Sequence, residues 1–150
     1  MSKVPDTMRA LFAVARHFHL QGWTVEMPGF RAAPPADVFE DYRDEGDLFI
    51  SQGDKRYRIE VKTLSVEFTS AADWPFKEVF VTRQEGVDRD GDSVFAYVSV
   101  NQSMTHMVVV RSSTKEHWCT KNVIDHLTKE DKPTAACPLE HVSFHELRAE

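Results

Sequence analysis

Residues 46–63 carry side chains whose types and spacing suit metal-dependent hydrolysis. The segment reads GDLFISQGDKRYRIEVKT, with Asp47 near its start and the triplet Glu60-Val61-Lys62 near its end. Mg²⁺ is a hard cation that binds proteins through one or two carboxylates and keeps several water molecules. An ammonium group nearby can orient an attacking water or stabilise developing negative charge. These residue types predict hydrolysis at a phosphoryl group if the fold brings Asp47 to Glu60.

A β-hairpin would bring the two acids together. Gly53-Asp54 suits a two-residue hairpin turn, with glycine in the first central position. With this turn Asp47 faces Glu60 across two antiparallel strands, with Cβ atoms about 5 Å apart. Two facing carboxylates are destabilising unless a positive charge lies between them, which favours a metal ion. The opposite face of the hairpin is apolar and contains Leu48, Ile50, Tyr57, Ile59 and Val61.

The same charges also fit a strand face that only meets solvent. In this alternative Lys62 neutralises Glu60, and Arg58 or Arg56 pairs with Asp47. A Glu-x-Lys triplet alone is a weak signal. The presence of Asp47 at the cross-strand position opposite Glu60 is what favours a metal site.

Asp47, the short hairpin and the sequence IEVK at 59–62 resemble the core motif of the PD-(D/E)XK nuclease superfamily. The segment Gly22-Trp23-Thr24-Val25 is similar to the Holliday junction resolvase-like members. The resemblance covers roughly residues 6–82, and its motifs are short. It implies a restriction-endonuclease-like mixed sheet flanked by helices, with an αβββαβ core and extra C-terminal strands. It further implies that Asp47, Glu60 and the backbone carbonyl of Val61 bind Mg²⁺ or Mn²⁺, and that Lys62 is the catalytic lysine.

The sequence departs from this family at two positions. Gly46 stands where the name-giving pattern has proline, and the first helix has no glutamate for the metal site. Glu26 and Glu45 are the candidate replacements for that third acid. Without a third acid, either the site binds metal weakly or the chain is a catalytically degenerate relative that binds nucleic acid or another protein, for example as a phage-encoded inhibitor.

DNA is the expected partner of the leading hypothesis, an endonuclease that hydrolyses phosphodiester bonds. Arg56, Arg58 and Lys77 are candidate phosphate contacts, although a solvated face explains them equally well. Trp74 beside Lys77 either stacks on bases or closes one end of the core. A homodimer is expected if both DNA strands are cut.

The net charge of −6 does not exclude a DNA partner, because most of it is local. Residues 37–47 contain six acids and one arginine, so this segment carries −5 of the total. A bound divalent cation would offset part of that charge.

The chain of 150 residues suits one domain over residues 1–150. The sequence has no apolar run long enough to span a membrane and no pattern typical of a signal peptide. Its two cysteines are too few for a disulfide scaffold, which favours a reducing, cytoplasmic setting. A zinc site formed by His117, Cys119, Cys137 and His141 is a weaker alternative, because the spacings match no familiar zinc motif.

Hydrophobic periodicity and turn residues predict a mixed α/β domain of the α+β type. We expect a helix over 6–21 that stops at Gly22, a long loop over 28–46, a turn region over 85–92 and a second helix over 115–128. Pro133 and Pro138 are expected to interrupt the chain after it. Strands are expected at 23–27, 47–51, 56–63, 78–82, 93–100 and 106–112, with a partly helical crossover at 64–76 and either a strand or a short helix at 141–147.

Overall fold

Two β-sheets and two α-helices organise the part of the chain that the computed structural model describes, residues 6–27, 46–124 and 129–147. The helices are α1 (Asp6–Leu20), α2 (Gln84–Asp90) and the short 3-10 helices η2 (Ala71–Asp73), η3 (Ser112–His117) and η4 (Leu139–His141). The strands are β1 (Thr24–Glu26), β2 (Gly46–Gln52), β3 (Lys55–Thr63), β4 (Glu78–Arg83), β5 (Ala96–Val100), β6 (His106–Arg111), β7 (Cys119–Ile124), β8 (Asp131–Pro138) and β9 (Ser143–Glu146).

The larger sheet has the strand order β1-β2-β3-β5-β6-β9 among the described residues. Within it β3 and β5 run parallel, and the other neighbours are antiparallel. The chain between β3 and β5 contains β4 and α2, and β4 belongs to the smaller sheet of order β4-β8-β7. The predicted mixed α/β class is therefore confirmed.

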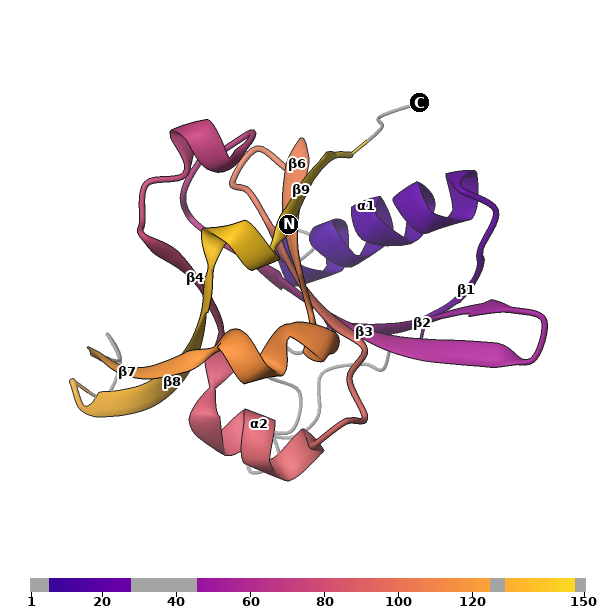
Figure 1. Cartoon of the computed structure of the whole chain (residues 1–150). Helices are drawn as coiled ribbons and strands as arrows, with labels where there is room; N and C mark the ends of the chain where they lie inside the picture. Colours follow the sequence, from indigo (N-terminus) through magenta and orange to yellow (C-terminus); the bar gives the residue numbers. More distant parts are fainter. Residues whose placement is uncertain (1–5, 28–45, 125–128, 148–150) are drawn as a thin grey trace, which may run out of the picture.

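The two faces of the larger sheet are covered by different elements (Figure 1). Helix α1 packs on one face, where Val14 joins Leu48, Ile59 and Val98 in a first core. The smaller sheet and α2 pack on the other face in a second core, which contains Val81, Val87, Tyr97, Val110 and Cys137. The result is three layers, with β5 and the middle of β3 around Ile59, Glu60 and Val61 buried between them.

Helix α1 ends as the sequence predicts. Gly22 adopts a φ of +96°, a conformation that costs glycine little because it has no Cβ. The Gly22 amide donates to the His19 carbonyl at 3.0 Å, and the Trp23 amide donates to Phe18 at 3.1 Å. These bonds close the last turn and direct the chain into β1.

The β2–β3 hairpin has the predicted register over its full length. Asp47 pairs with Glu60, and Gln52 pairs with Lys55 beside the turn. Gly53 has a φ of +59°, as the first central position of a type II′ turn requires. Asp47 and Glu60 thus project from one face, and the buried apolar side chains of both strands all lie in the first core on the opposite face, namely Leu48, Ile50, Ile59 and Val61.

The prediction of a turn over 85–92 is wrong, because α2 occupies most of it. Val87 is buried against the smaller sheet and holds the helix there. A Cβ on Gly86 would lie 3.3 Å from Thr82 Oγ1, so the glycine reflects close helix–strand packing and not a turn. Gly91, with a φ of +55°, then ends the helix. Tertiary packing outweighs the low intrinsic helix propensity of this sequence.

The prediction of a second helix over 115–128 is also wrong within its described part. Residues after η3 form β7, which pairs with β8 from Cys119↔Ala136 to Ile124↔Asp131. Neither proline interrupts β8, because each lies where the strand has one neighbour. Pro133 precedes the first pair with β4, and Pro138 follows the last pair with β7. Proline is tolerated at such positions, where a strand has an open side.

The remaining expectations hold, with small shifts at the element ends. Strands form at β1, β4, β5 and β6, the 141–147 segment contains β9, and the 64–76 crossover contains only η2. The predicted loop lies outside the described residues except for Gly46, which begins β2. In the described ranges, no helix has both the length and the apolar character needed to cross a membrane.

Candidate functional site

Asp47 and Glu60 face each other in the hairpin, as the turn predicts. Both side chains project from the sheet face that the smaller sheet and α2 cover, opposite to buried Ile59 and Val61. Glu60 is only 7% exposed, and the Asp47 side chain is 23% exposed. The two carboxylates therefore lie at the margin of the second core.

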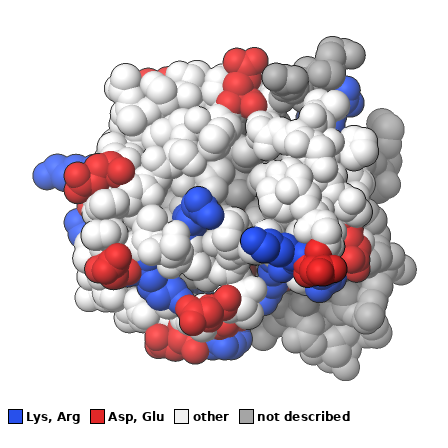
Figure 2. All heavy atoms as spheres, turned by 45° about the vertical axis from the view of Figure 1, so that its right-hand side comes forward, with Lys and Arg blue, Asp and Glu red and all other residues white. Residues whose placement is uncertain are grey.

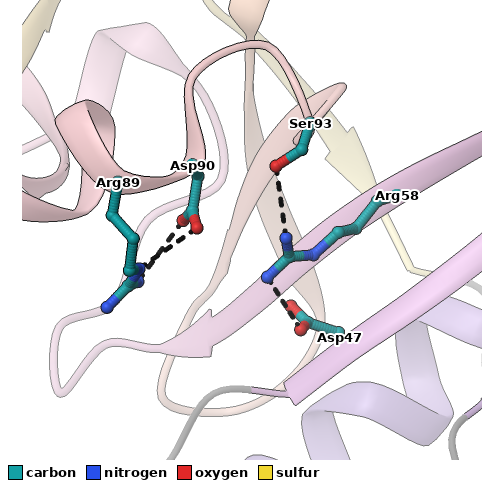
Figure 3. Close-up of polar contacts among 5 residues, drawn as sticks. All are labelled: Asp47, Arg58, Arg89, Asp90 and Ser93. Atoms are coloured by element: carbon teal, nitrogen blue, oxygen red, sulfur yellow. Dashed lines mark hydrogen bonds and ion pairs between the residues drawn. The ribbon is translucent and has the colours of Figure 1, made fainter.

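Asp47 forms an ion pair with a residue of its own hairpin. Arg58 Nη2 donates to Asp47 Oδ2 at 3.0 Å, and Arg58 Nη1 donates to Ser93 Oγ at 3.3 Å (Figure 3). Burial raises the pKa of the Asp47 carboxyl above its usual value, and the Arg58 charge opposes part of this rise. Asp47 Oδ1 is buried and has no hydrogen-bond partner among the described residues.

Lys62 follows Glu60 on the same face of β3 and points toward the smaller sheet. Its Nζ donates to the backbone carbonyl of Val81 on β4. The side chain is half-buried. This bond across the two sheets orients the ammonium group at the same margin as the two acids.

Tyr97 on β5 is the neighbour of Glu60 across the parallel strand pair. Its side chain is 2% exposed, and its hydroxyl has no hydrogen-bond partner in the described part of the chain. Burial raises the pKa of Tyr97 to about 12, with smaller contributions from the charges of Glu60 and Asp90. The phenol therefore stays protonated and adds a hydrogen-bond donor near Glu60.

Asp90, the last residue of α2, adds a third negative charge to this neighbourhood. Arg89 donates to both of its oxygens, at 3.2 and 3.3 Å, as Figure 3 shows. The Asp90 charge contributes to raising the pKa of both Asp47 and Tyr97. Sequence reasoning missed Asp90 and Tyr97. The helix around Asp90 was predicted as a turn, and no local pattern reveals the parallel register that places Tyr97.

The two candidates for a third acid do not complete the cluster. Glu26 lies on β1, its side chain is 67% exposed, and it pairs with Arg56 at 3.3 Å. Glu45, the other candidate, lies outside the described residues. Within the described ranges, no group of three or more His, Cys, Asp or Glu side chains has the arrangement of a metal site.

The predicted phosphate contacts lie in separate places. Arg56 is exposed on the hairpin and stacks over the Phe49 ring at 3.8 Å, Arg58 holds Asp47, and Lys77 is exposed just before β4. Trp74 is buried against Phe68, with ring centroids 4.9 Å apart. Of the two roles considered for Trp74, the structure supports packing in the core.

The four residues of the zinc alternative are not arranged around a common centre. The rings of His117 and His141 stack in parallel with centroids 3.8 Å apart. Cys119 is exposed on β7, whereas Cys137 is buried on β8 beside Thr114 Oγ1 at 3.8 Å. Burial raises the pKa of the Cys137 thiol, so this group favours its neutral form.

The residues at the hairpin base fit a hard divalent cation. Asp47 and Glu60 supply carboxylate oxygens from adjacent strands, and Asp47 Oδ1 is a buried acceptor without a partner among the described residues. Two carboxylates and water suffice for Mg²⁺, so a third acid is not required. The Arg58 guanidinium contacts Asp47 Oδ2, so it competes with a metal ion for this carboxylate but leaves Oδ1 without a hydrogen-bond partner among the described residues.

Comparisons with known proteins identify no relative of this chain: no protein-family model, no curated protein and no solved structure matches it.

Proposed function

We propose that the chain is a metal-dependent nuclease of the PD-(D/E)XK type, which hydrolyses phosphodiester bonds in DNA. The single observation that carries the proposal is the pairing of Asp47 with Glu60, with Lys62 next on the same face of β3. The order of α1, β1, β2 and β3, with β5 added parallel to β3, agrees with the fold that the resemblance implies.

Asp47 and Glu60 would hold Mg²⁺ or Mn²⁺, with the Val61 carbonyl as the further ligand that the resemblance implies. A bound divalent cation would polarise a phosphoryl oxygen and lower the pKa of a coordinated water.

The chain's own residues supply position and charge. The near-complete burial of Glu60 keeps its carboxylate in a poorly solvated place, where interactions with cations are strong. The Val81 carbonyl orients the Lys62 ammonium, which would orient the attacking water or stabilise negative charge on the phosphate. The Tyr97 hydroxyl adds a neutral donor beside Glu60.

Cleavage of supercoiled plasmid DNA tests the proposal. We expect nicking that requires Mg²⁺ or Mn²⁺, stops with a chelator, and falls at least about 100-fold in Glu60→Gln and Lys62→Met. Glu85→Gln is the matched control, because Glu85 lies exposed at the start of α2, where it forms a long, 3.9 Å ion pair with Arg83. Cleavage that persists in both purified site variants would overturn the proposal.

A second candidate function is a binding module without catalysis, for nucleic acid or another protein. The Arg58–Asp47 ion pair favours it, because the chain itself already neutralises one of the two acids. On the face shown in Figure 2, Lys and Arg lie beside Asp and Glu, without one continuous basic area. Calorimetric titration with Mn²⁺ separates the two functions, since the absence of saturable binding would favour the binding module.

A further inference from the structure

Arg58 connects two segments that lie far apart in the sequence. Its guanidinium bridges Asp47 on β2, at 3.0 Å, and Ser93 in the segment between α2 and β5, at 3.3 Å (Figure 3). The Arg58 and Asp47 side chains are 24% and 23% exposed. The pair is thus shielded from bulk water without being sealed in the core.

The neighbouring arginine on the same face of β3 is in a different situation. Arg56 pairs with Glu26 at 3.3 Å, and these side chains are 52% and 67% exposed. Both arginines carry one positive charge, but Arg58 alone of the two contacts a residue of the proposed metal site.

We propose that Arg58 is an exchangeable cation of this site, which pairs with Asp47 in the metal-free protein and with a DNA phosphate once a divalent cation occupies Asp47. This inference rests on the proposed function and adds to it a coupling between metal and DNA. Binding of each would strengthen binding of the other, because both release Arg58 from Asp47.

The chemistry of the guanidinium supports such an exchange. A divalent cation at Asp47 Oδ1 would repel the guanidinium at Oδ2 of the same carboxylate, which weakens the Arg58–Asp47 ion pair. The planar fork of arginine binds carboxylate and phosphate with the same two-donor geometry. A phosphodiester at the site carries the negative charge that both cations attract. Ser93 Oγ already accepts from Nη1, so the guanidinium retains one contact while Nη2 changes its partner.

Mn²⁺ titration calorimetry on the full chain tests the first half of the inference. We expect Arg58→Met to bind Mn²⁺ about threefold or more tightly than the unchanged chain, because no guanidinium competes for Asp47. Arg56→Met removes the same charge from the same strand, and its Mn²⁺ affinity should stay close to that of the unchanged chain. Arg58→Lys keeps the charge but loses the fork, so its affinity should lie near that of the unchanged chain. Thermal unfolding followed by circular dichroism shows that each variant is folded.

Fluorescence anisotropy with a short labelled DNA duplex tests the second half. The measurements use Lys62→Ala as the background, so that the probe stays intact. We expect Mn²⁺ to raise DNA affinity when Arg58 is present and to raise it much less in Arg58→Met.

The outcomes separate this inference from the proposed function. Equal Mn²⁺ affinities in Arg58→Met and Arg56→Met would overturn the exchange and leave the metal site intact. An equal gain in DNA affinity with and without Arg58 would overturn the phosphate contact. Absence of saturable Mn²⁺ binding in the unchanged chain and in Arg58→Met would overturn the metal site itself, and the inference with it.

Discussion

The β2–β3 and β7–β8 hairpins differ in how much of their structure comes from local sequence. β2 and β3 alternate apolar and polar side chains around a short turn. Both strands are most buried at the end of the hairpin away from the turn. β7 is exposed at nearly every position, and its partner β8 is held by Ala135, Ala136 and Cys137 in the core. Figure 1 shows the two hairpins at opposite sides of the molecule. We infer that the local sequence of the β2–β3 hairpin determines its register, whereas the β7–β8 hairpin depends on the contact of β8 with β4.

The largest expected effect is the difference in stability lost when an apolar side chain is truncated in each of the two hairpins. Leu48 on β2 is fully buried, so Leu48→Ala should lower the free energy of unfolding by about 2–5 kcal/mol. Ile124 on β7 is 58% exposed, so Ile124→Ala should change it by about 0.5 kcal/mol or less. Urea unfolding measures both. Similar losses in the two variants would contradict the proposed difference.

A smaller effect tests the turn that sets the register of the first hairpin. Gly53 has a φ of +59°, and a Cβ there would meet nothing within 4 Å. Gly53→Ala should therefore cost about 1 kcal/mol, through backbone conformation alone. Asp54→Ala is the control at the second turn position, where the change in unfolding free energy should be much smaller. A neutral Gly53→Ala in chemical denaturation would show that the turn is not what determines the register.

The smallest effect concerns the outer hairpin. Lys121 on β7 contacts Glu78 on β4 at 2.7 Å, which ties the edge strand across β8. This hydrogen bond raises the pKa of Lys121 above its usual value. Stability from a raised lysine pKa is fully present below the unfolded pKa and is lost as pH rises through the folded pKa.

Lys121→Met should therefore be slightly less stable than the unchanged chain at neutral pH, and this difference should vanish at strongly alkaline pH. Unfolding midpoints in denaturant at the two pH values provide the measurement. Lys129→Met, an exposed lysine before β8, is the control. A difference that grew with rising pH would rule out the ion pair as its cause.

Local sequence was sufficient for the elements with strong periodicity. Helix α1, its end at Gly22 and the pairing of Asp47 with Glu60 were all predicted. The wrong predictions concern segments whose secondary structure is determined by tertiary packing. Gly86 suggested a turn, but close contact with Thr82 explains it, and Pro133 suggested a break, but β8 has only one neighbour there. The burial of Val87 against the smaller sheet, which holds α2 in place, and the edge position of Pro133 in β8 both depend on residues far away in the sequence.

The sequence by itself determined the hairpin and the opposition of its two acids. A two-residue turn and strict alternation allow only one register that buries the apolar side chains. The tertiary structure decided what surrounds those acids. The parallel pairing of β3 with β5 places Tyr97 beside Glu60, the smaller sheet provides the Val81 carbonyl for Lys62, and the segment after α2 brings Ser93 to Arg58. These contacts depend on a crossover and on packing between sheets, where partners far apart in the chain meet only in the folded state.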